Sequence, residues 1–271
     1  MVDPVVICSG IQHLPLKGYF SSSINEFLDD LMKGDARALS RETNDLIEKN
    51  MKTIVKGICV AHGVDYEISY KNKMPLLLYL HGCTGLGDGV FLQKLSSIGI
   101  VIIAPDSFAR SYRPMQCNPK TKKGGKNLFI YDFRSAELTY ALEKISEIPW
   151  IDFNNLFLFG ASEGGVTAAL FRGNVFNGRV ITQWTCTGAP LIEGIDAPKN
   201  EPILAIVKES DPWYASDKTI SQDGNCGSYM LDRLNSKSII LKNVSGEDPH
   251  NVFTGDESLF EIKKFIRQNI R

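Results

Sequence analysis

The stretch Leu156–Leu170, with the sequence LFLFGASEGGVTAAL, decides the fold. It opens with an uninterrupted apolar run, which is typical of a strand covered on both faces, and it ends in residues that favour a helix. Between the two, residues 160–164 read GASEG and match the pattern G-x-S-x-G. In a strand–turn–helix context this pattern holds a serine on a strained turn with its hydroxyl above the sheet. We therefore predict that Ser162 is a catalytic nucleophile.

The helix that begins after Ser162 directs free backbone N–H groups and the positive end of its dipole at the place where an oxyanion would develop. The alternative is a glycine-rich turn whose serine has no chemical role. The strand before the turn, the helix after it and the additional Gly165 favour the nucleophile.

A serine nucleophile needs a base, and the base needs an acid that orients it. On this kind of sheet the chain order is serine, acid, histidine. Of the 4 histidines, His250 alone lies downstream of Ser162, in a loop before the last predicted helix. We expect His250 to be the base, and the alternative is a solvated loop histidine.

The acid should leave the strand that precedes this loop. Residues 203–207, ILAIV, predict that strand, and Asp211 follows it in the segment KESDPW. We expect Asp211 to orient His250. Three other carboxylates remain candidates for the same role, namely Glu209, Asp217 and Asp248.

An oxyanion hole needs a second N–H donor from the loop after the first core strand. Residues 74–80 predict that strand, and HGC follows at residues 81–83. We expect the backbone N–H of Cys83 to act together with that of Glu163. The side chain of His81 then holds the loop and is not the base.

Apolar strands alternate with helices from residue 73 onward, which predicts an α/β domain with a mostly parallel central sheet and helices on both faces. About 17 residues, 185–201, separate two of the strands, so a large cap domain is excluded. We divide the chain into an N-terminal extension, residues 1–55, and a catalytic domain, residues 56–271. In the extension, residues 1–24 look irregular, and helices are expected over 25–32 and 41–55. We expect the extension either to pack on the core or to cover the site. The expected core strands are 74–80, 98–104, 156–159, 180–184, 203–207 and 238–241, an antiparallel hairpin precedes them over 57–70, and the main helices are 127–148, 163–172 and 257–270.

Charge and length bound the function classes. The chain has 271 residues with 30 Lys and Arg against 31 Asp and Glu, a formal net charge of −1. Such a balance gives no electrostatic reason to expect nucleic acid or an anionic membrane as a partner. No apolar run approaches the length of a membrane span, and no signal peptide is visible. We expect a monomer or a homodimer.

Taken together, these motifs resemble the α/β-hydrolase superfamily and, within it, the dienelactone hydrolase family, over residues 57–271. The resemblance includes HGC-x-G at 81–85, APDSF at 104–108 and SDPW at 210–213. It implies the α/β-hydrolase fold and a Ser-His-Asp hydrolase that needs no cofactor and no metal. Dienelactone hydrolases proper have a cysteine nucleophile where this chain has Ser162, which points to a broader, esterase-like activity on a small-molecule ester.

The resemblance also bears on the cysteines. Some periplasmic relatives with an HGC turn also have a cysteine after the PDSF segment, and this resemblance implies a disulfide between Cys83 and Cys117. Cys186 and Cys226 look like a second such pair. Paired cysteines would favour a periplasmic or secreted protein, whereas free thiols suit the cytoplasm.

The sequence nominates four side chains for the substrate pocket. Arg110 and Arg113 follow the PDSF segment, and either could bind a substrate carboxylate. Trp184 and Trp213 are candidate pocket walls. For each of the four, a role in the core or on a solvated loop is the alternative.

Three rival functions stay open. A peptidase or amidase would use the same residues. A non-catalytic binding module could use the same scaffold, although a complete Ser, Asp and His set argues against it. Nucleotide binding is the third, because Gly85-Leu86-Gly87-Asp88-Gly89 follows a strand and Asp106 lies near the spacing of a ribose-binding acid. However, the pattern is G-x-G-x-G and not the G-x-G-x-x-G of the dinucleotide fingerprint, because position 90 is valine.

Overall fold

A computed structural model describes the chain at residues 5–7, 73–87, 89–109, 113, 116–124, 127, 129–146, 148, 151–187, 192–213 and 225–271. The expected helices of the N-terminal extension, the expected hairpin, Arg110 and Asp217 lie outside these residues. No helix within the described ranges is long and apolar enough to cross a membrane.

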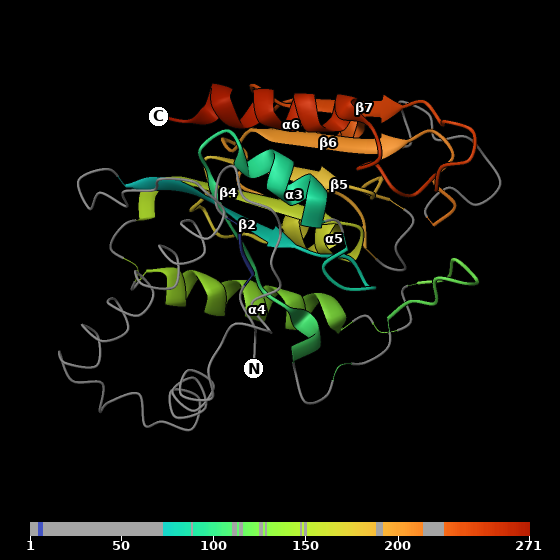
Figure 1. Cartoon of the computed structure of the whole chain (residues 1–271), viewed down its shortest axis with the longest axis horizontal. Coiled ribbons are helices and arrows are strands. Elements are labelled where there is room, and N and C mark those ends of the chain that lie inside the picture. The colour runs from blue at the N-terminus through green and yellow to red at the C-terminus, as the bar shows by residue number, and fades with distance from the viewer. Residues whose placement is uncertain are drawn as a thin grey trace.

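Within the described residues, strands form one sheet in the order β1-β3-β2-β4-β5-β6-β7 (Figure 1). The pairs from β3 to β7 are parallel, and β1 runs antiparallel to β3 at the edge. Parallel neighbours require crossover connections, and several of these contain helices. The strands are β1 (Val5–Ile7), β2 (Met74–Leu80), β3 (Val101–Ala104), β4 (Ile151–Ala161), β5 (Gly178–Thr182), β6 (Ile203–Lys208) and β7 (Lys237–Leu241), and the helices are α3 (Gly89–Ser96), η2 (Ser107–Ala109), α4 (Ile130–Ile145), α5 (Glu163–Leu170), η3 (Cys226–Tyr229) and α6 (Asp256–Asn269).

Helices cover the two faces of the sheet, α3 and α6 on one and α4 and α5 on the other (Figure 1). Strand β2 shows why: its alternate residues point to opposite faces. Leu77 and Tyr79 pack with residues of α3 and α6, whereas Leu76 and Leu78 pack with residues of α4 and α5. Both faces are therefore apolar, as the uninterrupted hydrophobic runs predict.

Several elements differ from the sequence-based expectation. Residues 5–7 form β1, although the first 24 residues look irregular; a run of three apolar residues is too short for a strand prediction on its own. Helix α3 follows a glycine-rich loop that hides its start, and it was not predicted. The strand expected from residue 98 begins at Val101, because residues 97–99 form a turn in which Gly99 has φ 87°.

Candidate active site

The turn at Ser162 has an unusual backbone conformation. Ser162 has φ 55° and ψ −116°, a region that residues with a side chain rarely adopt, and such strain concentrates at functional sites. Its N–H donates to the carbonyl of Thr182 at 2.9 Å. A side chain at Gly164 would overlap the carbonyl oxygen of Leu80, so glycine is required for α5 to approach β2. The turn places Ser162 at the carboxyl end of β4, between β2 and β5.

Three side chains that are distant in sequence form one chain of hydrogen bonds. His250 Nε2 lies 3.0 Å from Ser162 Oγ, and His250 Nδ1 lies 2.7 Å from Asp211 Oδ2. Asp211 is fully buried, and its other oxygen accepts from the backbone N–H of Trp213 at 2.9 Å. The carboxylate is therefore held while it faces the imidazole, which fixes the orientation of the ring.

The alternative acids lie elsewhere. Glu209 accepts from Lys242 Nζ at 2.8 Å on the surface. Asp248 Oδ1 accepts from the backbone N–H of His250 at 3.0 Å and its other oxygen pairs with Lys122, so it shapes the loop and does not bind the ring. Of the described candidates, Asp211 is the carboxylate that contacts the imidazole.

One residue that contacts the backbone of His250 was not predicted from the sequence. Gln183, just after β5, has φ 60° and donates through Nε2 to the carbonyl oxygen of His250 at 2.9 Å. This bond ties the histidine loop to the end of the sheet. A glutamine after a strand has no sequence signature, so only the structure reveals it.

The loop after β2 lies beside Ser162. A Cβ on Gly82 would lie 3.3 Å from the Cβ of Ser162. A disulfide joins Cys83 of this loop to Cys117. Within the part of the chain that the structure describes, the backbone N–H groups of Cys83 and Glu163 donate to no other protein group. Among the described residues, therefore, neither donor has a protein acceptor.

A cavity of about 470 Å³ opens in front of Ser162 and His250. Trp213 forms part of its wall, and its ring centroid lies 5.4 Å from that of His250. Lys122 Nζ lies 5.8 Å from the centroid of the Trp213 ring. Further lining comes from Thr84, Pro119, Gln183, Asn251 and Phe253.

Two other nominated pocket residues that the structure describes, Trp184 and Arg113, lie in the interior. Trp184 is buried and donates through Nε1 to the carbonyl of Thr187 at 3.1 Å. The Arg113 side chain is 6% exposed and donates to Ser107 Oγ at 2.8 Å and Glu163 Oε1 at 2.5 Å. Neither lines the described cavity. The expectation that Arg113 binds a substrate carboxylate does not fit this geometry, because Glu163 already occupies its guanidinium.

His81 holds the loop that follows β2. Its Nδ1 lies 2.7 Å from the carbonyl oxygen of Gly82, and its Nε2 accepts from the backbone N–H of Ser107 at 3.0 Å. Burial, with the nearby charge of Arg134, lowers the pKa of His81 to about 3. The ring is therefore neutral at ordinary pH and ties the carboxyl ends of β2 and β3 together.

Charged side chains are buried next to the serine turn. Arg134 of α4 lies 3.7 Å from Glu163 and 3.5 Å from Glu137. Burial lowers the pKa of Arg134 and raises the pKa of the Glu163 carboxyl, and in each case the opposite charge of the partner opposes the shift. The described residues contain no cluster of His, Cys, Asp and Glu arranged to hold a metal ion.

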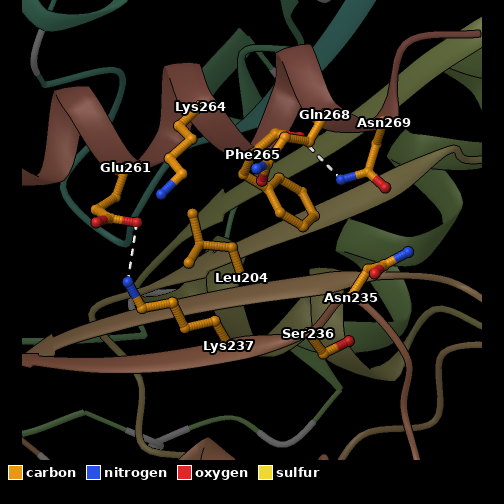
Figure 2. Close-up of a pocket in the computed structure, with 9 residues that line it drawn as sticks. All are labelled: Leu204, Asn235, Ser236, Lys237, Glu261, Lys264, Phe265, Gln268 and Asn269. Atoms are coloured by element: carbon orange, nitrogen blue, oxygen red, sulfur yellow. Dashed lines mark hydrogen bonds and ion pairs between the residues drawn. The ribbon is translucent and has the colours of Figure 1, made fainter.

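Three further features take no part in the hydrogen bonds between Ser162, His250 and Asp211. A second disulfide joins Cys186 to Cys226. Asp106, the acid of the nucleotide-binding alternative, accepts from the backbone N–H of Phe108 at 2.8 Å and so caps a turn. A cavity of about 370 Å³ lies between α6 and the start of β7, where Lys237 and Glu261 form an ion pair of 3.1 Å (Figure 2).

Comparisons with known proteins address the fold. No protein-family model matches the chain. Over 45 residues the chain is 38% identical to YhaA of Bacillus subtilis (strain 168), whose name describes it as an amidohydrolase, and this match spans 17% of the chain and 11% of YhaA. The structure of DcsB in complex with its substrate analogue is similar with a TM-score of 0.53 and 14% identity, over 73% of this chain and 92% of that one. A structure named as a dienelactone hydrolase, from Klebsiella pneumoniae subsp. pneumoniae MGH 78578, has a TM-score of 0.46 and 16% identity, over 73% of this chain and 88% of that one.

The likeness to DcsB agrees with the parallel strand order and with helices on both faces of the sheet. The chain has the α/β-hydrolase fold, as the sequence motifs predict.

Proposed function

We propose that this chain, an α/β hydrolase by fold, is a serine hydrolase that cleaves carboxylic esters of small molecules. The observation that carries the proposal is the chain of hydrogen bonds from Ser162 Oγ through His250 to Asp211, with distances of 3.0 and 2.7 Å. The proposed nucleophile, base and orienting acid are thus hydrogen-bonded in series at a strained strand-to-helix turn, which is the arrangement of Ser-His-Asp hydrolases. The catalytic unit is residues 56–271.

In the proposed mechanism, His250 Nε2 takes the proton of Ser162 Oγ as this oxygen adds to the ester carbonyl carbon. Asp211 accepts from Nδ1–H and stabilises the imidazolium. The backbone N–H groups of Cys83 and Glu163 hold the oxyanion of the tetrahedral intermediate.

As the intermediate collapses, the ester C–O bond breaks and the imidazolium gives its proton to the leaving alkoxide. His250 then deprotonates a water molecule as the water attacks the acyl carbon. The bond between this carbon and Ser162 Oγ breaks, the imidazolium returns the proton to Oγ, and the carboxylic acid leaves. Every step uses groups of this chain and water.

The pocket and the disulfides extend the proposal. A cavity in front of the serine, with a tryptophan wall and mixed polar lining, suits small substrates. Two disulfides are stable where the surroundings are oxidising, which favours action outside a reducing cytosol.

The decisive experiment is intact mass after treatment with a fluorophosphonate, wild type against Ser162→Ala. We expect one adduct on the wild type and none on the variant. Turnover of p-nitrophenyl esters should then be lost in His250→Ala and reduced about 10⁴-fold in Asp211→Asn, as in serine proteases. A folded wild type without adduct would overturn the proposal.

The same assay separates the ester from the amide activity. We expect hydrolysis of p-nitrophenyl acetate and no measurable hydrolysis of p-nitroacetanilide under identical conditions. Comparable rates on both substrates would assign the chain to the amidase class.

A further inference from the structure

One guanidinium touches both loops that supply the proposed oxyanion donors. Arg134, in the second turn of α4, has 0% side-chain exposure. Its Nη2 donates to the carbonyl oxygen of His81 at 3.0 Å, two residues before Cys83. Its Nη1 lies 3.2 Å from His81 Nε2. Its Nε lies 3.7 Å from Oε1 of Glu163, the residue after the serine. Arg134 therefore contacts the Cys83 loop and the Glu163 side chain at once.

A second arginine holds Glu163 from the other side. Arg113 Nη2 donates to Glu163 Oε1 at 2.5 Å, and its Nε donates to Ser107 Oγ. The hydroxyl of Ser107 donates in turn to Glu137 Oε1 at 2.9 Å. The Glu163 carboxylate, 3% exposed, is thus fixed between two cations although it is adjacent in sequence to the nucleophile.

Stability alone does not account for this cluster. Removing charges from water costs several kcal/mol per ion, about as much as their attraction returns, so a well-packed apolar cluster of equal volume would be as stable. The cluster lies where two backbone N–H groups must be set at a defined separation. Geometry at that place affects the transition state, where the oxyanion develops, more than it affects the bound ester.

We propose that Arg134 is a positioning residue that sets the separation of the Cys83 and Glu163 N–H donors, by holding the His81 carbonyl on one side and the Glu163 carboxylate on the other. The inference rests on the proposed hydrolase function. It assigns no contact between Arg134 and the substrate, because the guanidinium is wholly interior.

The test compares Arg134→Lys with Arg179→Lys, a matched control. Arg179 is equally buried and ion-paired, to Glu201, but it lies on β5 beside Leu158, four residues before the serine. Kinetics on p-nitrophenyl acetate are measured for both variants, together with the inhibition constant of phenylboronic acid. The boronate adduct with the serine places an oxygen in the oxyanion hole, so its affinity reports on that hole.

We expect Arg134→Lys to lower kcat about 10- to 100-fold with KM changed less than twofold, since loss of one complete oxyanion donor costs about 10²- to 10³-fold. Boronate affinity should fall in parallel. Arg179→Lys should lower stability and leave kcat and boronate affinity within twofold of the wild type. Glu163→Gln, which keeps the backbone donor and the side-chain length, should reproduce the kcat loss and serves if Arg134→Lys does not fold.

Combining the two substitutions tests whether both residues act through one contact. The double variant of Arg134→Lys and Glu163→Gln should be no slower than the slower single variant. Unchanged kcat in the single variants, with an active wild type, would overturn the positioning role and leave the hydrolase proposal intact. Equal kcat losses in the Arg134 and Arg179 variants would also overturn it, as a general loss of structure. A wild type that neither turns over esters nor takes the fluorophosphonate would overturn both proposals.

Discussion

Two buried Arg–Glu clusters lie near opposite ends of the parallel strands, one toward the amino ends and one at the carboxyl ends. They differ in how completely their hydrogen bonds are formed. Arg179, near the start of β5, donates to both carboxylate oxygens of Glu201 at 2.5 and 2.9 Å and to the carbonyls of Ala168, Phe171 and Gly173. In the cluster beside the serine, Arg134 Nε and Glu163 Oε2 are buried and have no hydrogen-bond partner among the described residues.

The difference separates two uses of the same chemistry. Arg179 closes the end of α5, where helix carbonyls have no partner within the helix, and a saturated set of bonds there stabilises the fold. An incompletely bonded polar cluster is rare in native interiors and calls for an explanation. At the serine turn the explanation is position, because the cluster spans the two loops of the proposed oxyanion hole.

The largest expected effect on stability comes from the saturated cluster. Arg179→Met should lower the free energy of unfolding by about 3 to 5 kcal/mol, because Glu201 is left as an uncompensated buried charge. Urea unfolding followed by circular dichroism measures it. The double variant with Glu201→Leu should recover part of the loss, since it removes the unpaired charge. A loss below about 1 kcal/mol in Arg179→Met would mean that the two clusters do not differ as described.

The disulfides extend the comparison to covalent links. They close segments of similar size, with sequence separations of 34 and 40, so removing either one should cost about 2 to 4 kcal/mol of stability. Replacing Cys83 and Cys117 by alanine should also lower kcat, because Cys83 belongs to the loop beside Ser162. Replacing Cys186 and Cys226 should leave kcat within about twofold of the wild type in the folded protein, by analogy with the Arg179 control.

Urea unfolding and ester kinetics on both pairs check this. Equal loss of kcat in the two double variants would show that stability, and not contact with the Cys83 loop, governs activity.

The three residues Ser162, His250 and Asp211 could be nominated from the sequence because a motif, the chain order or a preceding strand points to each of them. The G-x-S-x-G pattern places Ser162 at a strand end, and a single downstream histidine leaves one base to consider. Asp211 follows from the strand before it. Arg134 carries no such signal, since one basic residue in an amphipathic helix resembles a solvated one. Its proposed role depends on contacts with His81, 53 positions away, and with Glu163 in another element, which one sequence does not specify.

The fold divides in the same way. The parallel strands were predictable because long apolar runs have few other uses in a soluble chain. Strand β1 pairs three residues with β3 across about 95 positions, and its formation depends on a partner that local sequence does not name. Helix α3 was hidden by the glycines that precede it.

His81, which contacts Arg134 in the cluster beside the serine, should make the stability of the protein depend on pH. Its pKa of about 3 in the folded protein lies below the unfolded value of 6.5. Between these values the unfolded chain binds a proton that the folded chain does not, so stability falls as the pH falls from 6.5 toward 3. Between pH 6.5 and pH 5, His81 should lower the free energy of unfolding by about 2 kcal/mol.

Urea unfolding at several pH values, wild type against His81→Gln, measures this contribution. The variant should show a shallower decline, and the remaining slope comes from the carboxylates. Equal slopes in the two proteins would mean that His81 takes up its proton in the folded state.

The smallest expected effect on stability comes from an exposed Arg–Asp pair. It tests whether burial, and not simply the pairing of an arginine with a carboxylate, makes the interior clusters important for stability. Arg172 donates through Nε and Nη2 to Asp196 Oδ2 at 3.1 and 2.7 Å, but its side chain is 82% exposed. Solvent screens such a pair and the side chains lose entropy on pairing, so Arg172→Ala should cost about 0.5 kcal/mol or less in urea unfolding. Raising the salt concentration should reduce this stability cost further. A loss comparable with that of Arg179→Met would mean that contact geometry outweighs burial, and the distinction between saturated and unsaturated buried clusters would then lose its physical basis.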